Sequence, residues 1–135
     1  MTEKIILIID DHGALRYVLS FDLQKKGYKT LTAGNGENGI EIALAEKPDL
    51  ILLDAMMPGI DGFETCRRLK ATEDTKNIPV IMVTAKSQRK DVLDGFQSGV
   101  TSYMVKPFKF EELYNKIVEV IGVPLTEVPQ GTGVS

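Results

Sequence analysis

Short apolar runs alternate with helix-like segments along this chain, and this alternation constrains the fold more than any other feature of the sequence. The apolar runs are five or six residues long, as strands are, and occupy residues 4–9, 28–33, 49–53, 79–83 and 101–105. The segments between them repeat apolar residues at helical spacing, at residues 14–26, 38–47, 63–72, 89–99 and 110–122. The sequence therefore predicts five strands that alternate with five helices.

The helical connections determine how these strands pair. A strand, a crossover helix and a second strand in one sheet place the two strands parallel, with a right-handed connection. The runs at 4–9, 49–53 and 79–83 are almost wholly apolar, so we expect them at the centre of the sheet, covered on both faces. The runs at 28–33 and 101–105 are more mixed and should lie towards its edges. The expected fold is α/β, with a doubly wound, five-stranded parallel sheet.

The size and charge of the chain limit what it can bind. Its 135 residues suit one domain of ordinary size. A formal net charge of -3 offers no broad cationic surface, so we expect no direct contact with nucleic acid or an anionic membrane. No apolar stretch approaches the ~18 residues of a membrane span. The single cysteine, Cys66, forms no disulfide within the chain, and a reducing cytoplasm is the expected location.

The composition changes near the end of the last predicted helix. Residues 1–122 contain all ten predicted elements and are expected to form the domain. Residues 123–135 are rich in Pro, Gly and Thr, which is typical of a flexible tail or the start of a linker.

Polar side chains follow four of the five predicted strands, at the point where each strand ends. Asp10 and Asp11 follow the first strand, Asp54 the third, Thr84 the fourth and Lys106 the fifth. Each of them taken alone also fits a helix cap, a turn or a solvated side chain. In an open parallel sheet, however, ligands bind outside the carboxyl ends of the strands, where all five residues converge. We therefore expect one site at this rim.

The residue types at this rim favour phosphoryl transfer with a hard metal ion. Three neighbouring carboxylates repel one another unless a cation lies among them. Oxygen ligands with room for water suit Mg2+, and the sequence offers no His/Cys set for zinc. A metal ion and a lysine around one aspartate neutralise a transferred phosphoryl group, which the aspartate can accept as an acyl phosphate.

Four stretches in order resemble the receiver domain of two-component response regulators. They are IIDDHGALR at 8–16, LILLDAMMPGIDGFE at 50–64, IPVIMVTA at 78–85 and GVTSYMVKPF at 99–108, and the resemblance covers residues 4 to about 121. It implies a flavodoxin-like (βα)5 fold with strand order 2-1-3-4-5.

The resemblance also implies a role for each residue of the acidic rim. Asp54 corresponds to the phosphoacceptor. Asp10 and Asp11 correspond to the acidic pair that holds Mg2+, with Asp11 as a direct ligand and Asp10 acting through water. Met56 stands where the family offers a backbone carbonyl to the metal. The metal set implied is therefore Asp10, Asp11, Asp54 and Met56.

Further positions match the parts of the family that sense the phosphoryl group. Thr84 corresponds to the switch hydroxyl, and Lys106 to the lysine that pairs with the phosphoryl group. The Lys106-Pro107 bond corresponds to one that is usually cis in the family, which costs little for an X-Pro bond. Tyr103 falls at the switch aromatic, although it also fits an ordinary strand tyrosine on a partly exposed edge.

The implied function is a signalling switch. A histidine kinase or a histidine phosphotransfer protein would supply the phosphoryl group, and the surface of the fourth helix, fifth strand and fifth helix would respond. Such a domain assists its own phosphorylation and dephosphorylation and is not a turnover enzyme. The resemblance leaves open a downstream output domain or effector protein, and a homodimer formed on phosphorylation.

Three other functions share parts of this pattern. GNGENG at 34–39 is a literal dinucleotide-binding fingerprint, with Asp54 at the distance of the ribose-binding acid, but that function leaves the rim residues unused. A flavin-binding protein of the same topology would place its phosphate against the Asp10-Asp11 pair, which would repel it. A phosphatase of the haloacid dehalogenase type needs a second aspartate at the position of Met56.

Overall fold

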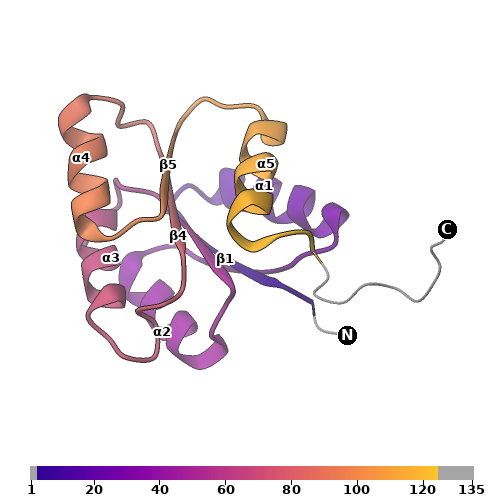
Figure 1. Ribbon diagram of the computed structural model, residues 1–135, viewed down its shortest axis with the longest axis horizontal. Helices are drawn as coiled ribbons and strands as arrows, with labels where there is room; N and C mark the ends of the chain where they lie inside the picture. Colours follow the sequence, from indigo (N-terminus) through magenta and orange to yellow (C-terminus); the bar gives the residue numbers. More distant parts are fainter. Residues whose placement is uncertain (1–2, 125–135) are drawn as a thin grey trace, which may run out of the picture.

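The alternating pattern folds into one parallel sheet between two layers of helices (Figure 1). The computed structural model describes residues 3–124. The strands are β1 (Ile5–Ile9), β2 (Lys29–Ala33), β3 (Leu50–Leu53), β4 (Val80–Thr84) and β5 (Ser102–Val105). The helices are α1 (Gly13–Lys26), α2 (Gly36–Glu46), α3 (Gly62–Lys70), α4 (Arg89–Ser98) and α5 (Phe110–Ile121).

The sheet has the predicted order, β2-β1-β3-β4-β5, and all of its pairs are parallel. The three most apolar strands occupy its centre and the two mixed strands its edges, as their composition predicts. Ile9 lies opposite Leu53, so β1 and β3 end level with each other, and β4 continues two residues past Met82, the partner of Leu53. This register brings the residues that follow β1 and β3 side by side.

Each face of the sheet carries its own apolar core. α1 and α5 cover one face, where Leu19, Leu23, Leu113 and Ile117 pack on Ile8 and its neighbours. α2 and α3 cover the other face, and α4 extends that layer beside α3 and β5 (Figure 1). Cys66 is fully buried there on α3 and packs in the apolar core.

One helix begins earlier than the periodicity predicts. α2 starts at Gly36 rather than at residue 38, because Asn35 caps it: the Asn35 side chain accepts a 2.8 Å hydrogen bond from the Asn38 amide. Apolar periodicity alone does not detect a first turn made of Gly, Glu and Asn.

The two ends of the described chain meet at the start of the sheet, away from its carboxyl rim. The Lys4 amide donates a 3.2 Å hydrogen bond to the Pro124 carbonyl, and the Tyr28 hydroxyl donates one of 2.9 Å to the Gly122 carbonyl. Residues 125–135, most of the predicted tail, lie outside the described residues. Within residues 3–124, no helix is long and apolar enough to cross a membrane.

Candidate functional site

The carboxyl rim of the sheet gathers the three predicted carboxylates. Asp10, Asp11 and Asp54 each place a carboxylate oxygen within 4.8 Å of the others. Asp10 is 4% exposed and Asp54 8% exposed, whereas Asp11 is open to solvent. The level ends of β1 and β3 produce this cluster, because Asp10 and Asp54 are the residues that directly follow paired strand positions.

Asp10 is held from several directions. Its amide donates a 3.1 Å hydrogen bond to the Ala33 carbonyl. Its Oδ1 accepts a 2.9 Å bond from the His12 amide, and its Oδ2 accepts a 3.0 Å bond from Lys106 Nζ. The side chain is therefore both buried and fixed in direction.

Lys106 brings the positive charge of the site to this rim from the far edge of the sheet. It follows β5 and is joined to Pro107 by a cis peptide bond, as the family pattern leads one to expect. Its Nζ lies 3.0 Å from Asp10 Oδ2 and 3.7 Å from Asp54 Oδ2. The lysine thus lies between the two buried carboxylates and is closer to Asp10.

The surroundings of Asp54 disfavour its ionised form. Burial raises the pKa of its carboxyl above the ordinary value, and the neighbouring Asp10 carboxylate raises it further. Lys106, the Met56 amide, which donates to Asp54 Oδ1 at 3.3 Å, and the Thr84 hydroxyl lower the pKa but do not cancel the rise. Separately from this pKa, the three carboxylates outnumber the lysine that contacts two of them.

This donor set fits Mg2+. It offers three carboxylates close together, of which that of Asp11 is exposed, and their negative charge is only partly compensated. A hard cation that keeps several waters requires such an environment. Met56 directs its side chain outward, where it is largely exposed, so only its backbone is available to the site.

A chain of contacts leads from Thr84 to Tyr103. Thr84, fully buried at the end of β4, accepts a 3.3 Å hydrogen bond on its Oγ1 from the Lys86 amide. The Lys86 carbonyl accepts a 2.8 Å bond from the Tyr103 hydroxyl. Tyr103 is half-buried on the edge strand, and its hydroxyl is bonded to the loop beyond Thr84.

The GNGENG segment, which resembles a dinucleotide-binding fingerprint, packs against α3 and the loop before it. It forms the β2–α2 loop and the first turn of α2. A Cβ at Gly36 would collide with the side chains of Thr65 and Ile60, so α3 and the loop before it fill the space that a dinucleotide phosphate would need.

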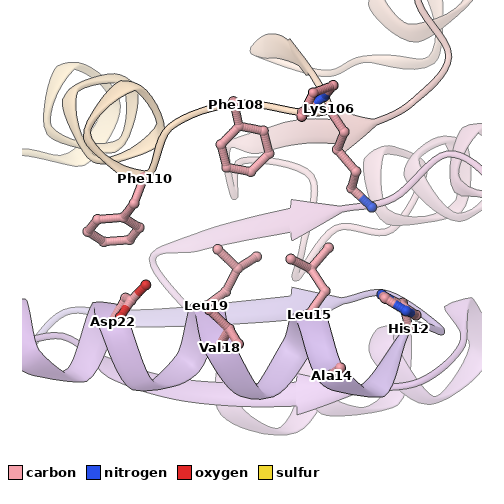
Figure 2. Close-up of a pocket in the computed structure, with 10 residues that line it drawn as sticks. His12, Ala14, Leu15, Val18, Leu19, Asp22, Lys106, Phe108 and Phe110 are labelled. Carbon is pink, nitrogen blue, oxygen red and sulfur yellow. The ribbon is translucent and has the colours of Figure 1, made fainter.

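One feature of the site is absent from the sequence predictions: an apolar surface on α1 beside the rim. Tyr17 is 73% exposed, Phe21 53% and Val18 50%. A groove of about 500 Å3 runs between α1 and the segment after β5 (Figure 2). Its lining includes Leu15, Val18 and Phe108, with His12 and Lys106 at the end nearest the rim. The sequence feature that could have indicated this surface is the number of apolar residues on α1, which exceeds what one buried stripe requires.

The fold and this rim define a class of protein: a doubly wound domain with an acidic, lysine-flanked pocket at the ends of its central strands. The sequence profile described as "Response regulator receiver domain" matches residues 6–118. The chain therefore belongs to the response regulator receiver family, whose members act as signalling switches.

Individual relatives agree with this assignment. The chain is 40% identical over 116 residues to the transcriptional regulatory protein AfsQ1 of Streptomyces coelicolor, covering 86% of this chain and 50% of that protein. It is 41% identical over 116 residues to the protein PilH of Pseudomonas aeruginosa, covering 86% and 96%. The chain thus matches about half the length of AfsQ1 and nearly all of PilH.

A solved structure shares the fold of this chain. The response regulator TrrA of Thermotoga maritima, solved in complex with Mg2+ and BeF, superimposes with a TM-score of 0.78 at 34% identity, covering 87% of this chain and 98% of TrrA.

Proposed function

We propose that Asp54 accepts a phosphoryl group from a phosphohistidine on a partner protein, and that Mg2+ bound at the rim is required. The observation that carries this proposal is the convergence of Asp10, Asp11 and Asp54 within 4.8 Å, with Lys106 between the two buried carboxylates. The bond that forms joins an Asp54 carboxylate oxygen to phosphorus. The phosphorus–nitrogen bond breaks, and the histidine keeps its electron pair.

Asp10, Asp11, Asp54 and the backbone carbonyl of Met56 would hold the metal ion. Bound there, Mg2+ supplies positive charge to the transferred oxygens. Asp11, the exposed member, suits direct ligation, and the buried Asp10 suits contact through water. The raised pKa of Asp54, caused first by burial and then by the Asp10 carboxylate, supports this assignment, because a cation lowers the cost of ionising a buried carboxylate.

Lys106 and Thr84 would respond to the new phosphoryl group. The lysine is already within 3.7 Å of Asp54, and a phosphoryl oxygen would give it a second anionic partner. The Thr84 hydroxyl would turn towards the phosphoryl group, and the Lys86–Tyr103 contact would carry the change to α4, β5 and α5. The switch is then a shift between two populations of that surface.

The phosphoryl donor would dock on the apolar surface of α1. Tyr17, Val18 and Phe21 are exposed there, and the groove beside them opens towards Lys106. An amphipathic helix that carries the phosphohistidine fits this surface, since its apolar side would cover α1 while the imidazole reaches the rim. A histidine kinase or a histidine phosphotransfer protein has that chemistry.

The proposed unit is a domain of residues 1–122 with a tail or linker start at 123–135, acting in the cytoplasm. It assists its own phosphorylation and its reset by water, and does not turn over a free substrate. An output domain or an effector protein would read the switch, and the domain itself would touch no nucleic acid, consistent with its net charge of -3.

Intact mass after incubation with a small phosphodonor tests this proposal. The wild-type chain should gain one phosphoryl group with Mg2+ and none after chelation, and Asp54→Asn should gain none in either case. Lys106→Ala should bind Mg2+ yet fail to switch its α4–β5 surface. A full phosphoryl gain in Asp54→Asn would overturn the assignment of the acceptor.

A further inference from the structure

Arg16 on α1 reaches back to the acidic rim through the backbone. Its Nη1 donates a 2.6 Å hydrogen bond to the carbonyl oxygen of Asp10. That carbonyl belongs to the peptide bond between Asp10 and Asp11. Arg16 therefore acts on the direction in which the chain passes from the buried carboxylate to the exposed one.

The guanidinium of Arg16 lies against bare backbone in the neighbouring loop. A Cβ at Gly34, which follows β2, would lie 3.3 Å from Nη1 and 3.8 Å from Cζ. That approach is tighter than an ordinary van der Waals contact, so the missing side chain at Gly34 gives the guanidinium its place. Gly13 also lies near, but a Cβ there would be 3.7 Å from Nη2, an ordinary contact.

The bond from Arg16 matters more for Asp11 than for Asp10. The Asp10 side chain is nearly fully buried and is bonded by the His12 amide and by Lys106. Asp11 is exposed, so packing contributes less to its direction. Fixing the peptide that leads into Asp11 is the most direct way to aim its carboxylate at the other two.

We infer that Arg16 is a positioning residue for the metal site: it holds the Asp10–Asp11 peptide so that the exposed Asp11 carboxylate meets the two buried ones. The inference rests on the proposed function, since it concerns Mg2+ binding at the same rim. Partners of metal ligands typically change metal affinity by ten- to a hundredfold when removed.

A role of Arg16 through its charge and a role in positioning predict opposite changes in Mg2+ affinity when Arg16 is removed. A cation beside an acidic cluster repels Mg2+, so a role through charge alone means that removing Arg16 tightens Mg2+ binding. A role in positioning means that removing it weakens Mg2+ binding. The sign of the change therefore separates the two.

Four variants of the full chain make the test specific. Arg16→Met removes both the charge and the donors, and should raise the Mg2+ dissociation constant on the order of tenfold. Arg16→Lys keeps the charge and a donor, and should recover part of the loss. Gly34→Ala keeps Arg16 but displaces its guanidinium, and should give a smaller rise in the same direction. Gly13→Ala is the matched control and should bind as the wild type does.

Mg2+ titrations followed by amide chemical shifts give the dissociation constants without any phosphodonor, and thermal unfolding in chelator shows whether each variant is folded. An Arg16→Met chain that binds Mg2+ as tightly as the wild type, or more tightly, overturns the inference, as does Gly34→Ala with an unchanged constant. A wild-type chain that binds no Mg2+ overturns the proposed function itself and this inference with it. Weakened binding in Arg16→Met and Gly34→Ala, with Gly13→Ala unchanged, supports it.

Discussion

The Tyr103 hydroxyl donates a 2.8 Å hydrogen bond to the carbonyl oxygen of Lys86 and so bonds the edge strand to the loop after β4. The same residue, Lys86, donates its amide to the Thr84 hydroxyl at 3.3 Å. A single residue, Lys86, thus lies between the buried hydroxyl at the acidic rim and the aromatic ring beside α4. Movement of either side chain requires the other contact to adjust.

Gly95→Ala should displace Tyr103 and still allow Asp54 to accept a phosphoryl group. A Cβ at Gly95 in α4 would lie 2.8 Å from both Cδ2 and Cε2 of the Tyr103 ring, so ring and helix must separate. We expect the bond to Lys86 to be lost and the free energy of unfolding to fall by about 1–3 kcal/mol, as for other overpacked sites. Fluorine spectra of 3-fluorotyrosine-labelled protein would show the shift of the Tyr103 signal.

Gln97→Ala serves as the control for that substitution, because residue 97 is exposed on the same helix. It should leave the Tyr103 signal unchanged. Gly95→Ala should still accept a phosphoryl group at Asp54, as measured by mass. A Tyr103 signal at its wild-type position in Gly95→Ala would show that the ring does not depend on the missing side chain.

Asp54→Asn should stabilise the metal-free protein at neutral pH. Burial and then Asp10 raise the folded-state pKa of Asp54, so the folded protein favours the protonated carboxyl. That favourable contribution is present below the ordinary aspartate pKa and is lost as pH rises through the raised value. The amide avoids this loss. Urea unfolding in chelator should therefore give Asp54→Asn a higher free energy of unfolding than the wild type at pH 7, and this difference should shrink towards pH 4.

The exposed Asp74→Asn provides the comparison for the pH series, and should change stability by no more than about 0.5 kcal/mol, as other surface substitutions do. A less stable Asp54→Asn at pH 7 would mean that the Lys106 contact outweighs burial and the Asp10 charge.

Tyr28→Phe should flatten the loss of stability at alkaline pH. Tyr28 is 2% exposed, and burial, followed by the neighbouring Tyr114, raises its pKa to about 12. The folded state therefore keeps a proton that the unfolded state loses, and stability falls as pH rises from about 10 to about 12. The variant also loses the bond to Gly122 and about 1 kcal/mol at neutral pH. Urea unfolding at pH 7 and pH 11 measures both effects, with the exposed Tyr17→Phe as control.

A double substitution on α1, Tyr17→Ser with Phe21→Ser, should separate docking from chemistry. Both side chains are largely exposed, so folding should be little affected. Phosphorylation by a small donor should keep its wild-type rate, while transfer from a phosphohistidine protein should slow by at least tenfold, as expected when aromatic contacts of an interface are removed. Leu93→Ser, at an exposed position on α4, should slow neither reaction. Equal transfer rates in the α1 variant and the wild type would place docking elsewhere.

Apolar patterning predicted a parallel sheet and its central strands, whereas the full strand order came from the resemblance to receiver domains. Strands buried on both faces must be apolar throughout, so β1, β3 and β4 could be placed at the centre and the mixed β2 and β5 at the edges. The convergence of Asp10, Asp54 and Thr84 followed from the same argument, because polar residues that end buried parallel strands emerge at one rim.

Long side chains account for most of what the pattern did not predict. The position of Lys106 at the rim was predicted, but its closer approach to Asp10 than to Asp54 was not. Arg16 lies on α1, and its bond to the Asp10 carbonyl depends on an empty position at Gly34. Val18 fits the buried stripe but is half exposed. These contacts and exposures depend on distances between segments in the folded protein, and the spacing of residues along the sequence does not give those distances.

The hydrogen bond between Lys4 and Pro124 holds the two ends of the described chain close together, which suits this domain to insertion into another protein. A host protein whose chain entered at one of these residues and left at the other would need only a short gap in its own backbone. The acidic rim, at the opposite end of the strands, would stay accessible. By the same geometry, a short peptide joining the two ends should permit a circular permutant with its new termini in a surface loop.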